Sequence, residues 1–189
     1  MTELSWKQPF IRTVEQVLAP AECAELICRI EALGPSDAPI TTPRGFQMRP
    51  DIRNNTRVMF DDPALASSLF AKVRGAIPDE LEGMSPLSAN ERLRCYRYEP
   101  GQYFAPHFDG AFTRNAAERS LLTFMVYLNE CEAGGHTKIL DLDLSIAPKP
   151  GCALLFNHHL LHEGARVERG IKYAVRSDLM YRRDGAPRG

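Results

Sequence analysis

Apolar residues recur at helical spacing in two segments near the N-terminus. Residues 20–33 carry them on one face and are followed by Gly34, a residue type common where helices end. The second segment begins with Asp62 as a cap and Pro63 in its first turn, and it stops before Pro78. The pattern predicts two amphipathic helices whose apolar stripes cover a core.

From Arg92 onward the pattern changes to short strand-like runs, separated by turn signals rich in Gly and Pro. The runs cover residues 92–98, 102–108, 120–128, 136–140, 152–156 and 172–181. Helices followed by many short strands predict an α+β fold, in which a helical N-terminal part, about residues 1–91, backs a β-sandwich or barrel of the jelly-roll type. The mouth of such a barrel can hold one small ligand.

A chain of 189 residues fits one domain, residues 1–189. No repeat or linker divides it, although residues 34–56 are polar and Pro-rich enough to form a long surface loop. The N-terminal MTELSWKQPF carries charge where a secretory leader would be apolar, and no run of roughly eighteen apolar residues is present. We therefore expect a soluble, cytoplasmic protein without a membrane segment.

Charge and cysteine content exclude two further classes. Lys plus Arg number 23 and Asp plus Glu number 24, so no overall field attracts a polyanion, and we expect no nucleic-acid partner. The five cysteines are scattered and lack a Cys-x-x-Cys pair, which argues against a disulfide framework or a zinc ribbon. They are typical of reduced, mostly buried thiols.

The segment PHFDG contains the first candidate chemistry. If it is a strand, His107 and Asp109 point to the same face, so a nitrogen and an oxygen share one small space. Two His and one carboxylate on one face of a metal ion are diagnostic of non-haem Fe(II) oxygenases, so a third ligand is needed. By itself this short motif is weak, because His-x-Asp pairs also arise as solvated surface residues.

Four further histidines are candidates for that ligand. His136 lies in a glycine turn without a partner nearby, and of His158 and His159 at most one could face a metal. His162 lies where the chain turns back into the last strand, and Lys172 follows ten residues later. We favour His162.

The last predicted strand places an unusual charge on one face. Strand parity groups Lys172, Ala174, Arg176 and Asp178 together. This face is either exposed to water or turned toward the barrel interior. In the second case Lys172 needs a carboxylate partner, because an unpaired buried charge costs several kcal/mol, and a diacid would supply one.

Three stretches of the chain together resemble a known family. The runs YRYEPGQYFAPHFDG, RSLLTFMVYLNECEAGGHT and PKPGCALLFNHHLLHEGARVERGIKYAVRSDLMY are similar to the 2-oxoglutarate- and Fe(II)-dependent dioxygenases of the prolyl 4-hydroxylase-like group. The resemblance covers about residues 92–181 and implies a double-stranded β-helix, a jelly roll, as the catalytic core.

The resemblance also implies roles for single residues. His107, Asp109 and His162 would hold Fe(II), and Lys172 would pair with the distal carboxylate of 2-oxoglutarate, with O₂ as the second cosubstrate. Tyr98 and Tyr127 match positions that bind the cosubstrate in relatives, although a packed core aromatic is the alternative for each.

The chain departs from the family pattern at two places. His136 stands where many relatives carry Glu in a Gly-Gly-Glu-Thr turn, and Lys172 stands where many carry Arg. We expect Arg176 and Asp178 to form an internal ion pair near the metal or to contact substrate, unless they are exposed at an edge. Asn157, Glu163 and Asp178 are candidate acceptors for the second nitrogen of a ligand histidine.

The leading hypothesis is hydroxylation of an unactivated carbon, in a prolyl or related residue of a protein or peptide, or in a small molecule. The run 53–57 and the loop 110–119 are candidates for substrate recognition. Two alternatives stay open: a non-catalytic jelly-roll sensor that binds metal or 2-oxoglutarate, and a nucleic-acid demethylase, which the balanced charge disfavours. The sequence leaves open the oligomeric state and whether ascorbate is needed.

Overall fold

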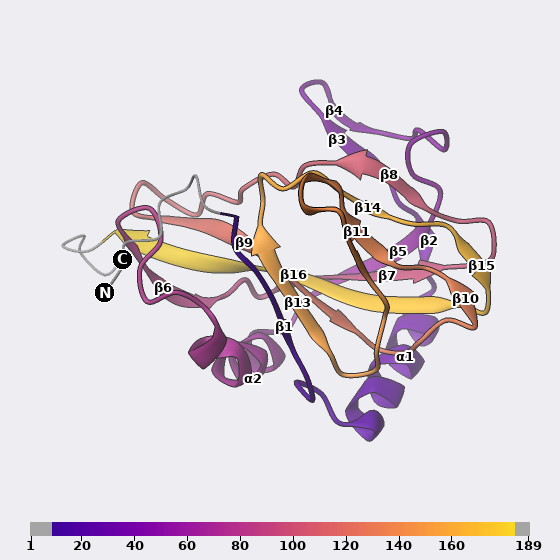
Figure 1. Ribbon diagram of the computed structural model, residues 1–189, viewed down its shortest axis with the longest axis horizontal. Helices are drawn as coiled ribbons and strands as arrows, with labels where there is room; N and C mark the ends of the chain where they lie inside the picture. The colour runs from indigo at the N-terminus through magenta and orange to yellow at the C-terminus, as the bar shows by residue number, and fades with distance from the viewer. Residues whose placement is uncertain (1–8, 184–189) are drawn as a thin grey trace.

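The computed structural model describes residues 9–183 (Figure 1). Its two α-helices are α1, Pro20–Leu33, and α2, Pro63–Val73, and short 3₁₀ turns cover Arg74–Ala76 and Leu140–Leu142. Most of the segment MTELSWKQPF lies outside the described residues, so the expectations about a leader and about the ends of the domain stay predictions. No helix in the described part of the chain is long and apolar enough to cross a bilayer.

Most of the remaining chain forms two main sheets. The larger has the strand order β1-β13-β9-β16-β7-β5-β2, with β6 paired to β16. Its strands are Ile11–Val14 (β1), Ser36–Asp37 (β2), Thr56–Asp61 (β5), Met84–Ala89 (β6), Arg92–Tyr98 (β7), Glu118–Tyr127 (β9), Ala153–Asn157 (β13) and Lys172–Arg183 (β16). The smaller has the order β12-β11-β14-β8. Its strands are Phe104–His107 (β8), Thr137–Ile139 (β11), Leu144–Ile146 (β12) and His162–Gly164 (β14).

Two short strand pairs complete the fold. Ala133–Gly134 (β10) pairs with Val167–Arg169 (β15), and Ile40–Thr42 (β3) pairs with Gly45–Gln47 (β4). The β3–β4 hairpin projects from the body of the molecule beside β8 (Figure 1).

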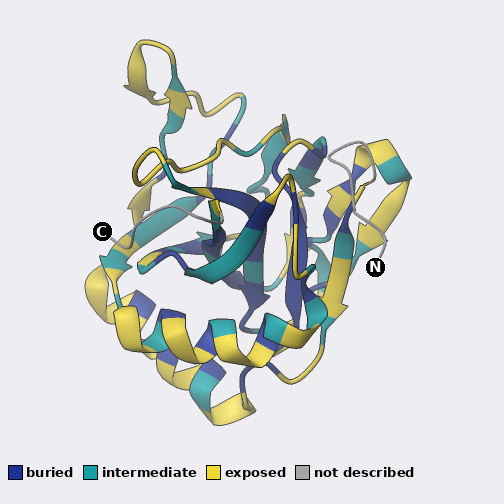
Figure 2. Cartoon of the chain, turned by 90° about the vertical axis from the view of Figure 1, so that its left-hand side faces the viewer, coloured by how far each residue is buried: buried dark blue, intermediate teal, exposed yellow. Residues whose placement is uncertain are grey.

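Strand β16 shows how the layers are built. Tyr173, Val175 and Leu179 point toward α1 and α2 and join the main hydrophobic cluster with residues such as Ile30 and Leu69. Figure 2 shows the helices with buried residues toward the sheet and exposed residues on the outside. The other face of β16 looks toward the smaller sheet, so the space between the two sheets receives the charged residues of this strand.

This architecture confirms the fold class: a jelly-roll core backed by N-terminal helices. Both helices begin at the predicted prolines, and every predicted strand is present with ends shifted by at most a few residues. The N-terminal part differs from the expected helical support, because β1, β5 and β6 also join the large sheet. These strands are short, β6 contains Pro86, and β5 is only partly buried, so none has the clear alternation that would reveal a strand.

A glycine fixes the approach of the N-terminal segment to the sheet. Gly151 has φ +70°, and its carbonyl accepts hydrogen bonds from the N–H groups of Val17 and Leu18. A Cβ at this position would lie 2.1 Å from the carbonyl oxygen of Leu18, which is backbone and cannot rotate away. The close contact and the left-handed conformation therefore both require glycine.

We predict that Gly151→Ala lowers the free energy of unfolding by at least about 2 kcal/mol, because it adds both backbone strain and a steric clash. Urea unfolding followed by circular dichroism measures the change. Gly75→Ala is the matched control, since Gly75 has ordinary φ and open space around it. Equal losses in the two variants would contradict the argument.

Candidate active site

Two histidines face each other across the smaller sheet. In the antiparallel pair β8–β14, His107 lies directly opposite His162, and the ring centroids are 4.2 Å apart. Asp109 follows β8, and its N–H donates to the carbonyl of His158. One ligand atom from each of His107, Asp109 and His162 lies within 4.8 Å of the others. The three residues, here called the triad, are thus brought together from positions far apart in the chain.

Backbone contacts select the free nitrogen of each histidine. Nδ1 of His107 lies 2.9 Å from the carbonyl oxygen of Ala105, and Nδ1 of His162 lies 2.9 Å from that of Leu160. A carbonyl oxygen only accepts, so Nδ1 carries the proton in both contacts and Nε2 keeps its lone pair. Both Nε2 atoms face the carboxylate of Asp109, at 3.7 and 3.5 Å.

The same contacts correct one expectation about the surroundings of the histidines. Asn157, Glu163 and Asp178 do not hold the rings. Asn157 instead accepts from the N–H of Phe10, and Glu163 pairs with Lys138. Backbone carbonyls two residues before each histidine accept the hydrogen bond from the ring instead, and no side-chain pattern in the sequence predicts them.

The histidines are kept neutral. Burial, together with the neighbouring His162, lowers the pKa of His107 to about 4, and burial also lowers the pKa of His162. Neutral imidazoles are the form that binds metal ions.

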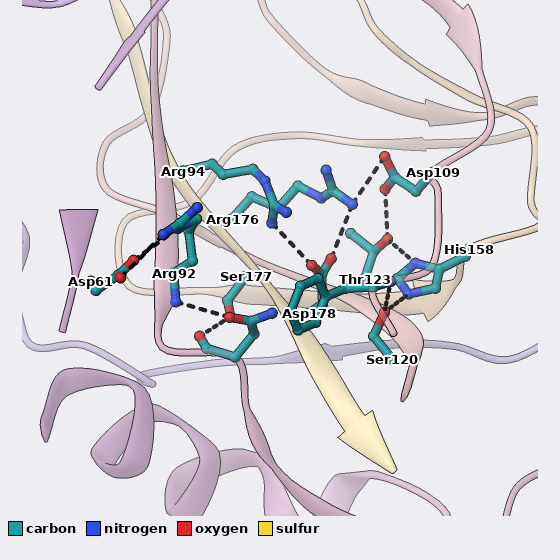
Figure 3. A network of polar contacts seen from close by, with 12 residues as sticks. Asp61, Arg92, Arg94, Asp109, Ser120, Thr123, His158, Arg176, Ser177 and Asp178 are labelled. Atoms are coloured by element: carbon teal, nitrogen blue, oxygen red, sulfur yellow. Dashed lines mark hydrogen bonds and ion pairs between the residues drawn. The ribbon is translucent and has the colours of Figure 1, made fainter. Parts of the chain in front are cut away.

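Asp109 is held as an anion from two sides (Figure 3). Its Oδ1 lies 3.2 Å from a guanidinium nitrogen of Arg176, and its Oδ2 accepts a hydrogen bond of 2.6 Å from the hydroxyl of Thr123. Burial would raise the pKa of Asp109, but the charge of Arg176 and the hydrogen bond from Thr123 act against it, so the pKa lies well below its usual range. The carboxylate is therefore ionised and oriented.

A polar network extends behind Asp109 (Figure 3). The hydroxyl of Thr123 also lies 2.9 Å from Nδ1 of His158, whose Nε2 lies 2.8 Å from the hydroxyl of Ser120. Both ring nitrogens of His158 thus have other partners than the triad, while His159 is exposed. Asp178 bridges Arg176 and Arg94 at 3.0 Å each, which is the internal ion pair expected from strand parity.

Lys172 lies in the same pocket as the triad. It is only 3% exposed, and its Nζ donates to the carbonyl of Gly135 and lies 5.4 Å from the ring centroids of Tyr98 and Tyr127. Within residues 9–183, no carboxylate forms an ion pair with it. Burial lowers the pKa of Lys172 to about 8. The charged face of β16 is therefore buried, and Lys172 has no anionic partner among residues 9–183.

The two tyrosines are placed differently. Tyr98 lines the pocket, whereas Tyr127 is fully buried and donates its hydroxyl to Thr137, which itself lines the pocket. Burial raises the pKa of both hydroxyls, so both are protonated donors. His136 is half-buried and is not among the lining residues.

Several pocket residues were not expected from the sequence. The ring of Phe104 stacks on His107 with centroids 3.5 Å apart, and Phe156 meets His162 edge to face at 4.6 Å. Tyr96 lines the pocket beside Tyr98. Phe104 lies three residues before His107, so strand parity alone assigns it to the opposite face; the irregular register of β8 explains why the parity argument missed it.

The part of the chain that contains the site is similar to known proteins. The family model of the 2OG-Fe(II) oxygenase superfamily matches residues 93–177. A putative prolyl 4-hydroxylase of Acanthamoeba polyphaga mimivirus is 31% identical over 107 residues, which cover 47% of this chain and 44% of the relative. The human prolyl 4-hydroxylase subunit alpha-3 is 32% identical over 100 residues, 45% of this chain and 18% of the relative.

Solved structures share the fold. A viral collagen prolyl hydroxylase from Paramecium Bursaria Chlorella virus-1, in complex with 2OG, aligns with a TM-score of 0.64 at 22% identity and covers 92% of this chain and 96% of its own. A prolyl-4-hydroxylase of Pseudomonas putida aligns with a TM-score of 0.65 at 19% identity over 89% and 91% of the two chains.

These comparisons confirm the resemblance read from the sequence: residues 93–177 match the model of the 2OG-Fe(II) oxygenase superfamily, and the chain is similar to prolyl 4-hydroxylases. The matched residues contain the triad and Lys172. The chain spans less than half the length of the viral and human sequence relatives.

The buried cation generates a prediction. Lys172→Met removes the unpaired charge and keeps a side chain of similar length. In ligand-free protein near pH 7 we therefore expect the free energy of unfolding to rise by up to about 3 kcal/mol. The pKa of Lys172 is about 8 in the folded protein and 10.5 ordinarily, so between these values the unfolded chain binds more protons and wild-type stability rises with pH. The difference between variant and wild type should shrink across this window.

Urea unfolding at several pH values measures this difference. Lys149→Met is the matched control, because the Lys149 side chain is 67% exposed. A gap that stays constant from neutral to alkaline pH would show that the charge of Lys172 is not its cause.

Proposed function

We propose that the protein is an Fe(II)- and 2-oxoglutarate-dependent dioxygenase that hydroxylates an unactivated carbon. One observation carries the proposal: His107, Asp109 and His162 share a buried pocket with Lys172, a cation that lacks an anionic partner among the described residues. Two imidazole nitrogens and one carboxylate are the donor set of the facial triad. The donor chemistry, the neutral histidines and the ionised Asp109 all fit a ferrous ion.

Each residue then has a physical task. His107 and His162 would offer Nε2, because their Nδ1 atoms donate to backbone carbonyls. Lys172 would bind the distal carboxylate of 2-oxoglutarate, with Tyr98 as a neighbouring donor, and the ring of Tyr127 would lie beside the Lys172 ammonium group. When bound, the iron would supply activation of O₂ and of the cosubstrate.

The remaining pocket residues hold these groups and exclude water. Phe104 and Phe156 cover the two imidazoles, and Arg176 and Thr123 fix the carboxylate of Asp109. Fixed ligands in a dry pocket require little reorganisation when reactants bind.

For the substrate we propose a prolyl or related residue of a peptide, or a small molecule. Sequence relatives named as prolyl 4-hydroxylases support the first choice. The non-catalytic sensor is less well supported, since all three candidate ligands and the cation are present together. The demethylase is disfavoured by the formal net charge of −1.

We further propose a reducing, cytoplasmic setting. All five cysteines are free, and Cys23, Cys95 and Cys152 are buried. Burial raises the pKa of Cys95 to about 12, which makes that thiol unreactive.

The decisive test is formation of succinate from 2-oxoglutarate in air, combined with the visible absorption of the anaerobic Fe(II)–2-oxoglutarate complex. Wild type should give a weak charge-transfer band and slow succinate release. The succinate assay is run with and without ascorbate, which tests whether the enzyme needs ascorbate. Asp109→Ala and His162→Ala should each reduce turnover by at least about a hundredfold, because each removes a metal ligand. His159→Ala is the control, since this exposed residue follows His158. Absence of the band together with tightly retained zinc would instead favour the sensor.

A second prediction concerns the hydroxyl that orients Asp109. Thr123→Val keeps the shape but removes the hydrogen bond of 2.6 Å, and we expect the apparent KM for Fe(II) to rise about 10–100-fold. Thr123→Ser should restore most of the affinity, because it returns the hydroxyl. Thr13→Val, at an exposed position of β1, is the control. An apparent KM for Fe(II) that Thr123→Val leaves unchanged would refute the role of Thr123 in orienting Asp109.

A further inference from the structure

A second cavity opens beside the triad toward solvent. It is a groove of about 530 Å³ between the large sheet, residues 39–41 at the start of the β3–β4 hairpin and the loop 108–112. It shares His107 and Asp109 with the inner pocket, so a molecule bound in the groove would lie next to the triad. Both segments that the sequence marked for substrate recognition contribute to its lining.

Four arginines line this groove: Arg53, Arg57, Arg94 and Arg176. Arg57, Arg94 and Arg176 come from the three adjacent strands β5, β7 and β16, and Arg94 lies directly opposite Arg176 in the sheet. Asp109 is the one acidic residue among the described lining, and Asp178 lies behind Arg94 and Arg176. Four positive charges therefore face two carboxylates, both already engaged.

Arg53 and Arg57 have no acidic partner within residues 9–183. Arg53 is only 4% exposed, its Nε donates to the side chain of Asn55, and its Nη2 is buried without a hydrogen-bond partner. The guanidinium lies between two rings, 4.7 Å from the centroid of Tyr96 and 4.5 Å from that of Phe104. Aromatic stacking holds it in place at the groove, although an unsatisfied buried donor is costly.

Arg57 is half-buried beside like charges. Burial, then the charges of Arg53 and Arg94, lower the pKa of Arg57. Clustered guanidinium groups without counter-ions destabilise the folded protein, so a structural role does not explain them. Guanidinium forks are the groups that bind carboxylates and phosphates most specifically.

We propose that the arginine groove binds an anionic oxygen group of the substrate, a carboxylate or a phosphate, and so selects acidic substrates over neutral ones. The assignment of the bound molecule as a substrate rests on the proposed oxygenase function, whereas anion binding itself does not. The apolar lining from Ile40, Ile52 and Phe108 suits the carbon skeleton that joins this group to the reacting carbon. The group can belong to a free acid or to an acidic residue in a peptide.

The first test measures anion binding without catalysis. Metal-free protein is melted in inorganic phosphate and in sodium chloride of equal ionic strength. Phosphate should raise the Tm of wild type and of Arg57→Lys, and the rise should be reduced by about half or more in Arg57→Gln. Arg12→Gln, at an exposed position of β1, should respond like wild type. The same phosphate response in all four proteins would overturn the proposal.

The second test compares matched substrates. Free carboxylic acids and acidic peptides are assayed against their primary amides for gain of one oxygen and for succinate release above the substrate-free rate. We expect the acids to have kcat/KM values at least about tenfold above the amides, and Arg57→Gln to remove this preference. The substrate-free rate should be the same in Arg12→Gln and wild type, and the rate of each variant with substrate is compared with its own substrate-free rate. Equal use of acids and amides would overturn the proposal, and preference for acidic peptides or for free acids would identify the source of the anion.

The two tests separate the two proposals. If no variant and no condition yields succinate, the oxygenase function fails, but the phosphate response still decides whether the groove binds anions. If succinate forms but Arg57→Gln changes neither measurement, the oxygenase stands and the anion site is refuted.

Discussion

The register between β8 and β14 is the constraint on which the site depends. These two short strands set His107 directly opposite His162, although the residues are separated by more than fifty positions in the chain. A shift of one residue in this pairing would turn one imidazole to the opposite face, since side chains alternate along a strand. The ladder that holds the smaller sheet together thus also determines whether a metal ligand set exists.

The two buried charges of the pocket, Asp109 and Lys172, have different surroundings. Asp109 is buried but compensated by Arg176 and Thr123, whereas Lys172 is buried with only a carbonyl and two aromatic rings as neighbours. Asp109 therefore has a counter-charge close by, whereas the electrostatic environment of Lys172 is incomplete because no described carboxylate pairs with it. An incomplete environment of this kind is typical of a binding site rather than of a structural core.

Much of this arrangement could be predicted from sequence because it depends on local periodicity. The helix at Pro63, the inward face of β16 and the spacing from His162 to Lys172 all follow from residue order. The partners of the histidine rings could not be predicted, because backbone carbonyls carry no side-chain signal. Neither could the approach of Arg57 to Arg94, since strand β5 has no clear alternation and its pairing with β7 depends on the completed sheet.

The column formed by Arg53, Phe104 and His107 joins the entrance of the site to its centre. The Arg53 guanidinium lies 4.5 Å from the centroid of Phe104, whose ring stacks on His107 at 3.5 Å. Flat groups in such close contact cannot shift independently, because protein interiors have few voids to absorb a displacement. A displacement of the Arg53 guanidinium would therefore require the ring of Phe104 to move as well, so side chains outside the triad limit the positions open to the His107 imidazole.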